Sequence, residues 1–192
     1  MEFKKIQLNG FKSFAEKTNF LIEKGLTGIV GPNGCGKSNI VESLRWCMGE
    51  TSAKSMRGSG MEDVIFSGTS NKPSKNIAEV VLSLNNENKD GPHQYNELED
   101  IEIRRKIEKD KGSKFYINNK EVRAKDAQMF FADLSTGAHS PSMISQGRIG
   151  ALVTAKPSDR RAILEEAAGI AGLHVRRHEA EIRLGAAENN LK

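Results

Sequence analysis

Several classes of protein are excluded by what this sequence lacks. No run of about 18 apolar residues occurs in its 192 positions, so no segment is long enough to cross a membrane as a helix. The first residues, Met1–Ile6, lack the apolar stretch of a secretory signal peptide, and we therefore expect a cytoplasmic protein. Only two cysteines are present, Cys35 and Cys47, and no metal-ligand pattern surrounds them. We expect both to be free thiols in a reducing compartment.

Signals for common enzymatic chemistry are also scarce. No Ser/His/Asp or Cys/His group predicts nucleophilic catalysis, and His139, His174 and His178 each stand alone. The formal net charge of +4 is compatible with nucleic-acid binding but too small to indicate it. A length of 192 residues suffices for one large domain, or for one domain with an appendage.

The strongest positive signal is the segment 31–38. It reads Gly-Pro-Asn-Gly-Cys-Gly-Lys-Ser and matches a G-x-x-x-x-G-K-S phosphate-binding loop at every fixed position. The apolar run Leu26–Val30 predicts a buried strand before the loop, and helix-like recurrence of apolar residues predicts a helix from Lys37. Glycines let the backbone N–H groups point at phosphate oxygens near the helix N-terminus. Lys37 is then expected to reach the β- and γ-phosphates and the Ser38 hydroxyl to ligate Mg²⁺, so the sequence predicts a nucleoside triphosphate site.

Most of the remaining sequence before residue 125 predicts strands in an antiparallel arrangement. Alternation of apolar and polar residues, or short apolar runs between turns, predicts strands at Phe3–Leu8, Thr18–Glu23, Val64–Phe66, Ala78–Leu84, 101–107, Lys114–Ile117 and Lys120–Val122. Asn118-Asn119 predicts a hairpin turn between the last two. The polar stretch 85–100 predicts an exposed loop.

The pattern becomes helical from Ser158 onward. Ser158 is expected to cap this helix, with Pro157 just before it. Further along, apolar residues recur at intervals of seven, as at Leu184 and Leu191, which favours equally the start of a coiled coil and an ordinary amphipathic helix. The predicted domain organisation is therefore a nucleotide-binding part at 1–157 and a helical neck at 158–192.

A phosphate loop alone does not hydrolyse a nucleotide. Hydrolysis also needs an acidic residue at the end of an apolar strand and a group that positions the attacking water. The best apolar run that ends in an acid is Met129–Asp133, but Asp126 before it and Leu134 after it predict an amphipathic helix. The sequence therefore indicates half of an active site.

Several segments together resemble the N-terminal head of the structural maintenance of chromosomes (SMC) ATPases, particularly those of bacteria. In chain order, the matching segments are Gly10–Phe14, Gly31–Ile40, Ser55–Gly58, Glu62–Phe66, Ile144–Gly147 and Arg160–Ile170. The match runs from about residue 3 to the end of the chain, and the ordered set is far more specific than any member except the phosphate loop. One departure is Cys35, which stands where serine is commoner, at a position where the loop acts through its backbone.

This resemblance implies an α/β fold, the P-loop ABC-type ATPase half-head, in which a mixed sheet carries an antiparallel β subdomain and an antiparallel coiled coil begins after it. In this family one polypeptide divides its head into two halves. The C-terminal half, beyond a long coiled coil and hinge, carries the signature motif, the Walker B acid and the catalytic glutamate. The isolated chain is then expected to bind ATP weakly at best and to hydrolyse it hardly at all.

The resemblance also implies the roles of individual residues. ATP is expected to contact Lys12, Ser13, Gly31, Pro32, Asn33, Gly34, Cys35, Gly36, Lys37, Ser38 and Asn39. Gln146, in a segment similar to the Q-loop, is expected to complete the Mg²⁺ shell with Ser38 and to act with Lys37 in catalysis. Arg57 resembles an arginine that contacts DNA or a phosphate across the head dimer. The plainer alternatives are a solvated charge for Arg57 and a polar pair at a strand end for Lys12 and Ser13.

The expected partners follow from the same resemblance. They are the C-terminal half-head, a second SMC head, a kleisin-type subunit at the neck, and DNA bound through its backbone in a salt-sensitive way. ATP would then favour the engaged pair of heads, and hydrolysis would separate them, in a nucleoid-associated protein that condenses and segregates chromosomes.

Three alternative functions remain open at this point. A related coiled-coil DNA-repair ATPase shares the split head and differs only in sequence beyond this chain. A membrane-transport ATPase subunit would carry the signature motif and Walker B strand in the same chain, with a Q-loop much closer than the 109 positions from Lys37 to Gln146. A truncated paralogue would bind nucleotide or kleisin without turnover.

Overall fold

The structure is a computed structural model that describes residues 1–89, 91–134, 143, 150, 153–168, 177, 180–182 and 184–188. The chain divides into two compact units, Met1–Gln128 and Met129–Lys192. The domain boundary expected between residues 157 and 158 stays a prediction. None of the described helices is both long enough and apolar enough to cross a bilayer.

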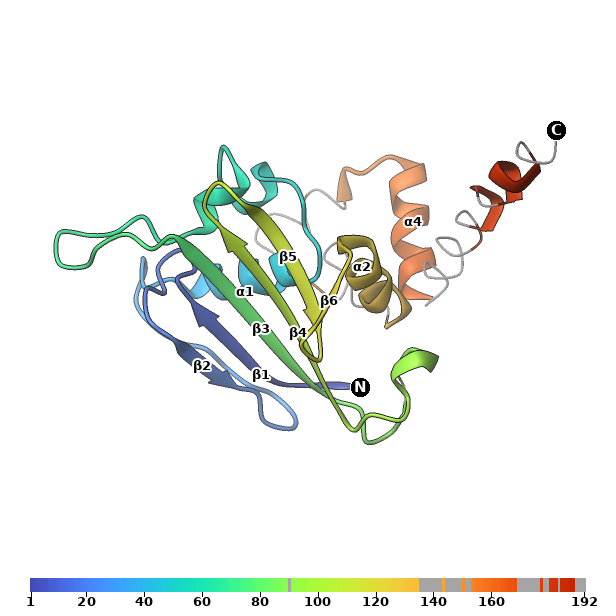
Figure 1. The fold of residues 1–192 in the computed structure, drawn as a ribbon, viewed down its shortest axis with the longest axis horizontal. Coiled ribbons are helices and arrows are strands. Elements are labelled where there is room, and N and C mark those ends of the chain that lie inside the picture. The colour runs from blue at the N-terminus through green and yellow to red at the C-terminus, as the bar shows by residue number, and fades with distance from the viewer. Residues whose placement is uncertain are drawn as a thin grey trace. The chain divides into compact units, whose positions relative to one another are not determined.

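A six-stranded sheet forms most of the first unit (Figure 1). Its strands are β1 (Glu2–Asn9), β2 (Thr18–Leu21), β3 (Ile77–Asn85), β4 (Asp100–Glu108), β5 (Gly112–Ile117) and β6 (Lys120–Val122). Their order across the sheet is β2-β1-β3-β4-β5-β6, and every neighbouring pair is antiparallel. Asn118 and Asn119 turn β5 into β6 with φ values of 47° and 65°, the left-handed conformation that a tight two-residue hairpin requires. The strands predicted from alternation and the predicted hairpin are confirmed.

One face of this sheet is apolar and packs against the helix α1 (Lys37–Cys47), which lies behind the sheet in Figure 1. Because side chains alternate along a strand, the same face collects every second residue of β1, β3, β4 and β5. The buried residues on it include Ile6, Leu8, Ala78, Val80, Leu82, Leu84, Ile101, Ile103, Ile107, Phe115 and Ile117. The helix contributes Ile40, Trp46 and Cys47 to the same core.

A charged residue, Arg105, occupies one position of this apolar face and is only 3% exposed. Its guanidinium lies between two aromatic rings, 4.4 Å from the Trp46 centroid and 4.6 Å from that of Phe115. It also donates to the backbone oxygens of Trp46 at 2.6 Å and Glu50 at 2.7 Å, and to the Ser113 hydroxyl at 2.8 Å. The Trp46 carbonyl lies in the last turn of α1 and also accepts from the Gly49 N–H, and Glu50 lies just beyond the helix, so Arg105 joins the C-terminal end of α1 to β4. Burial lowers the pKa of Arg105 to about 10, which leaves the side chain charged at neutral pH.

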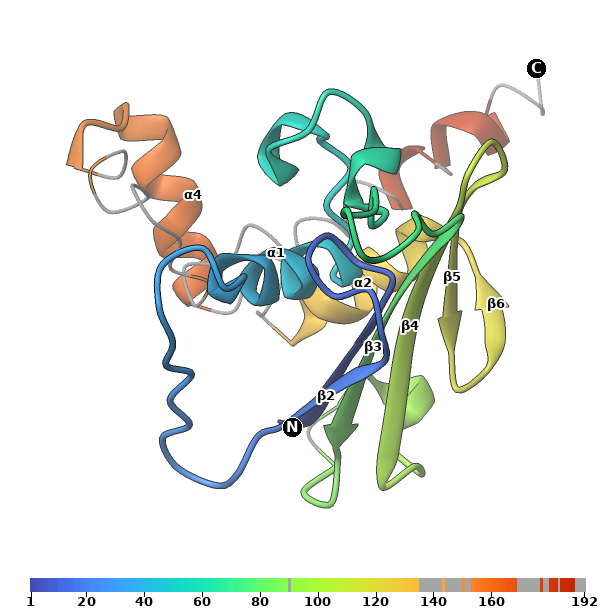
Figure 2. The ribbon, with the colours of Figure 1, turned by 90° about the vertical axis from the view of Figure 1, so that its left-hand side faces the viewer.

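The predicted strand Leu26–Val30 is wrong for this chain. Residues 22–36 form no strand, and they run outside the sheet between β2 and α1 (Figure 2). Leu26 is 99% exposed and Val30 is 94% exposed. Every strand pair that the structure describes is antiparallel, as expected for the antiparallel β subdomain, and no parallel pair is seen among the described residues. An apolar run becomes a buried strand only when neighbouring strands cover it, and the described part of this chain offers it none.

Two smaller expectations are corrected as well. In place of a strand at Val64–Phe66, a 3₁₀ helix (Met61–Val64) is followed by a single bridge from Ile65 to Phe11. Helix α4 (Pro157–Ala167) begins at the proline and not after Ser158. Proline suits the first helical position, because its fixed φ matches the helix and its missing N–H would have no partner there.

Three further expectations concern a helix near Met129–Asp133, the loop 85–100 and the heptad pattern. The predicted amphipathic helix around Met129–Asp133 is confirmed as part of α2 (Ala124–Asp133). The predicted loop 85–100 contains a short 3₁₀ helix (His93–Tyr95) and is anchored by Asn86, whose buried amide donates to the backbone oxygen of Leu98 at 2.9 Å. Leu191 of the heptad pattern lies outside the described residues, so the coiled coil stays a prediction.

We expect Arg105→Ala to lower the free energy of unfolding by about 3 kcal/mol, because it removes two buried ring contacts and the guanidinium hydrogen bonds to the carbonyls of Trp46 and Glu50. Urea unfolding followed by circular dichroism measures this loss. Lys106→Ala is the matched control, since Lys106 lies on the opposite face of the same strand, and it should change stability by less than about 0.5 kcal/mol. Equal losses of unfolding free energy in the two variants would show that Arg105 does not hold α1 against β4.

Candidate nucleotide-binding site

The predicted phosphate loop lies immediately before α1 and is open to solvent. Gly36 occupies the N-cap position of the helix, and Gly34 and Gly36 have φ values of 83° and 95°. The ammonium group of Lys37 donates to the backbone oxygens of Gly31 at 2.5 Å and Pro32 at 2.6 Å, so it lies directly against the loop. Gly31–Gly36 therefore lie before the helix and Lys37 and Ser38 in its first turn, at the positive end of the helix dipole, which is a favourable place for an anion.

The turn after β1 packs closely against the end of this loop. A Cβ atom on Gly36 would lie 2.4 Å from the Ser13 hydroxyl oxygen, so only glycine fits without displacing Ser13. Ser13 also accepts a hydrogen bond of 2.9 Å from the side-chain amide of Asn39. The structure thus brings two predicted contact regions, Lys12-Ser13 and the phosphate loop, into direct contact.

Lys12 and Arg57 meet at a carboxylate that sequence reasoning did not identify. Both cations pair with Glu42 on α1, one on each carboxylate oxygen, and Lys12 also donates to the backbone oxygen of Met56. Arg57 donates in addition to the side-chain oxygen of Asn39 at 3.1 Å. We call these residues with Ser13 the Glu42 cluster: Lys12, Ser13, Asn39, Glu42 and Arg57. One signal in the sequence pointed to Glu42, an acid placed between the buried helix residues Ile40 and Ser43.

The loop that carries Arg57 has a defined backbone. A 3₁₀ helix (Lys54–Met56) ends at Arg57, which adopts the left-handed conformation with a φ of 55°. Beyond it, the Asp63 carboxylate accepts from the backbone N–H groups of Ser59 at 2.6 Å and Gly60 at 3.0 Å. These bonds, first that of Gly60 and then that of Ser59, lower the pKa of Asp63. Arg57 is therefore presented by a structured turn.

The two cysteines occupy contrasting environments, and both are free thiols as expected. Cys35 is exposed in the phosphate loop, and the Lys37 ammonium lies 3.9 Å from its sulfur. Cys47 is fully buried on α1, where burial raises the pKa of its thiol to about 12.

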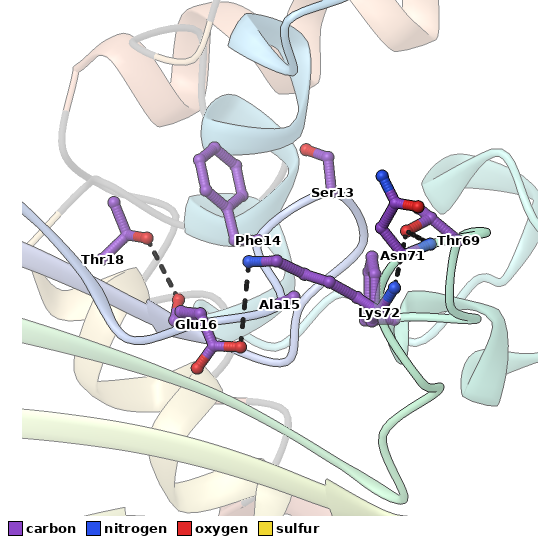
Figure 3. Close-up of a pocket in the computed structure, with 9 residues that line it drawn as sticks. Ser13, Phe14, Ala15, Glu16, Thr18, Thr69, Asn71 and Lys72 are labelled. Carbon is purple, nitrogen blue, oxygen red and sulfur yellow. Dashed lines mark hydrogen bonds and ion pairs between the residues drawn. The ribbon is translucent and has the colours of Figure 1, made fainter.

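A pocket of about 440 Å³ lies beside the turn after β1 (Figure 3). Ser13, Phe14 and Glu16 line it from that turn, and Thr69 and Lys72 line it from the turn across the opening. The Lys72 ammonium lies 3.9 Å from the Glu16 carboxylate. The pocket shares Ser13 with the Glu42 cluster.

Two parts of a complete hydrolytic site are not seen among the described residues. Gln146 and the rest of the predicted Q-loop lie outside them. Asp133, the acid considered for Mg²⁺, ends a helix and not a strand. The described ranges also contain no group of three His, Cys, Asp or Glu side chains arranged to hold a metal.

A family model and the sequences of known proteins place the chain in the same family. The model of the RecF/RecN/SMC N terminal domain matches residues 2–148. The chain is 56% identical over 191 residues to the chromosome partition protein Smc of Rhodopseudomonas palustris, and 58% identical over 191 residues to that of Cereibacter sphaeroides. Each alignment covers 100% of this chain but only 17% of the relative, so the chain spans about a sixth of the length of these proteins.

The fold is that of solved SMC head domains. The structure of an Smc head bound to the C-winged helix domain of ScpA aligns with a TM-score of 0.82 and 32% identity, over 89% of this chain and 52% of that chain. A structure from work on ATP-driven dimerization and DNA-stimulated activation of SMC ATPases aligns with a TM-score of 0.74 and 32% identity, over 87% of this chain and 99% of that chain.

We expect Cys35 to react with Ellman's reagent in the folded chain, because it is exposed, and Cys47 to react only after unfolding, because its thiol is buried and its pKa is raised to about 12. Mg²⁺-ATP at increasing concentration should slow the reaction of Cys35, since bound phosphates would cover the loop. Cys35→Ser should remove the fast phase. A rate for Cys35 that no concentration of Mg²⁺-ATP changes would contradict a nucleotide at this loop.

Gly36→Ala should weaken binding of a fluorescent ATP analogue by at least about tenfold, because the new Cβ clashes with Ser13 and the φ of 95° is strained for alanine. Fluorescence titration measures the affinity. Gly28→Ala is the matched control, since a Cβ there meets nothing within 4 Å, and it should bind as the wild type does. Equal affinities for all three proteins would show that the geometry of Gly36 does not serve the nucleotide.

Proposed function

The chain belongs to the RecF/RecN/SMC N-terminal domain family, and from this premise we propose that it is the N-terminal ATP-binding half of an SMC head, which becomes an ATPase when a C-terminal half completes it. The length of the relatives supports this proposal, because they continue far beyond the region that the chain matches. The names of the relatives favour chromosome partition over the alternative role in DNA repair.

The exposed segment Leu26–Val30 is the observation that carries the proposal. It leads directly into the phosphate loop, and in a strand–loop–helix nucleotide site the strand before the loop belongs to a sheet. Here Leu26, Ile29 and Val30 are exposed apolar residues, although α1 and the antiparallel sheet are fully formed. Burying them requires strands from another part of the protein, which is the role of the C-terminal half.

The residues at the loop fit a nucleoside triphosphate with Mg²⁺. Glycines of positive φ allow close approach of phosphates, the helix N-terminus and Lys37 supply positive charge, and the Ser38 hydroxyl is an oxygen ligand of the kind that Mg²⁺ prefers. Bound Mg²⁺ would neutralise the developing charge on the transferred phosphoryl group. Lys37 would hold the β- and γ-phosphates, and Gln146 would complete the metal shell and position water.

The remaining partners are proposed on the same basis. A second SMC head would contribute the residues that close the site, and ATP would stabilise the engaged pair. A similar head is solved with the C-winged helix domain of ScpA, which supports a kleisin subunit as a partner. Its location at the helical neck, residues 158–192, is the one that the family resemblance implies. DNA would be contacted through its backbone, in a cytoplasmic, nucleoid-associated assembly that condenses and segregates chromosomes.

We expect measurable ATP turnover only when this chain is mixed with the C-terminal half-head of the same protein. Lys37→Ala in the mixture should abolish turnover, because the lysine that holds the β- and γ-phosphates is lost. Phosphate release measures the rate. Robust turnover by the chain alone would contradict the split site.

Val30→Asp tests, in the same assay, whether the exposed segment Leu26–Val30 is buried by the C-terminal half. Because Val30 is 94% exposed in this chain, the substitution should leave its melting temperature unchanged, yet it should lower turnover of the mixture at least about tenfold by burying a charge. Leu98→Asp is the control, a partly exposed apolar residue in the 86–99 loop, and should leave turnover unchanged. Full turnover with Val30→Asp would show that the segment stays outside the completed head.

A further inference from the structure

The Glu42 cluster joins three segments that are distant in the sequence. Ser13 and Lys12 come from the turn after β1, Asn39 and Glu42 from the first half of α1, and Arg57 from the turn after a 3₁₀ helix. The cluster begins at Asn39, one residue beyond Ser38 of the phosphate loop. Its arrangement therefore affects the surroundings of any phosphate bound at that loop.

Glu42 is the fixed centre of this cluster. Its side chain is only 11% exposed, and that of Lys12 only 13%, so these two form a nearly buried ion pair. Arg57 differs, because 60% of its side chain is exposed although its guanidinium is held by both Glu42 and Asn39. A surface arginine ordinarily samples many rotamers, and two acceptors on one helix restrict this one.

The charges and donors of the cluster suit an anion. Two cations share one carboxylate, which leaves one positive charge in excess beside the N-terminal end of α1. Glu42 and Asn39 together engage the Nε and Nη2 atoms of Arg57, and the guanidinium carries five N–H donors. The N–H groups of the guanidinium that Glu42 and Asn39 do not engage have the planar geometry that binds a phosphate group of a nucleotide.

We propose that Glu42 is a positioning residue that holds Arg57 beside the phosphate loop, so that the arginine meets the nucleotide phosphates already ordered. This inference rests on the proposed function, since it assumes a nucleotide at the loop. Glu42 touches no phosphate itself and acts through Arg57. Lys12 pairs with the buried carboxylate and holds it in place, and the bond from Lys12 to the Met56 oxygen fixes the turn that precedes Arg57.

The test is a double-mutant cycle on binding of a fluorescent ATP analogue with Mg²⁺, in this chain and in the head completed by its C-terminal half. Glu42→Gln should weaken binding roughly three- to tenfold, the effect of releasing one long side chain. Arg57→Ala should weaken it at least as much. Adding Glu42→Gln to Arg57→Ala should cause no further loss, because the residue that Glu42 positions is already absent.

A merely structural role of Glu42 would give a different result. If Glu42→Gln weakens binding equally with and without Arg57, or does not weaken it at all, the proposal is overturned. Wild-type protein that fails to bind the analogue in either form overturns the proposed function, and this inference with it.

Glu42→Gln leaves the nearly buried Lys12 without its ionic partner and can therefore destabilise the fold. A second comparison, made in a variant that lacks the Lys12 charge, separates this effect from the release of Arg57. Lys12→Met is compared with Lys12→Met/Glu42→Gln, in which both buried charges are removed. The added Glu42→Gln should again weaken binding roughly three- to tenfold relative to Lys12→Met alone, as the same release of Arg57 predicts. Equal affinities of these two variants would overturn the proposal as well.

Discussion

The buried guanidinium of Arg105 is the interaction on which the arrangement of the first unit depends. It lies on the apolar face of the sheet, between the rings of Trp46 and Phe115, and donates to the carbonyls of Trp46 in the last turn of α1 and of Glu50 just beyond it. A buried charge is tolerated only where its donors are satisfied, so the helix end, the two rings and the strand must come together in one geometry. Arg105 thereby fixes α1 at its C-terminal end, and the phosphate loop lies at the opposite end of the same rigid helix.

Most of the sheet could be predicted because its signals are local. Alternation placed Ile101, Ile103 and Ile107 on one face. A fixed spacing of glycine, lysine and serine is an equally local signal, and phosphate binding at residues 31–38 stays a prediction. Arg105 occupies the same alternating row, although charged residues are rarely buried. The rings of Trp46 and Phe115 and the acceptors at the end of α1, brought from other elements, explain why it is buried.

Glu42 was not identified from the sequence, and Leu26–Val30 was wrongly predicted as a buried strand. Both failures have a common reason, since both features depend on residues that are distant in the chain. The role of Glu42 requires Lys12 and Arg57 to arrive from two other segments. The apolar run before the loop has the composition of a strand, yet strand formation needs neighbours, and its residues are exposed in the described structure. A local pattern states what a segment prefers, whereas the rest of the protein decides whether that preference is met.

Helix α1, which carries Glu42, and the exposed segment Leu26–Val30 lie on opposite sides of the phosphate loop in the sequence, and they differ in how firmly they are held. On the helix side, the loop is followed by α1, which Arg105 and the Glu42 cluster hold in place. On the other side, residues 26–30 precede the loop, lie outside every described strand, and expose Leu26, Ile29 and Val30. Under the proposed function, the nucleotide and the C-terminal half both order the same short loop, and ordering it once reduces the entropy lost in the second binding event. Binding free energies are reciprocal, so the factor by which ATP strengthens attachment of the C-terminal half must equal the factor by which that half strengthens ATP binding.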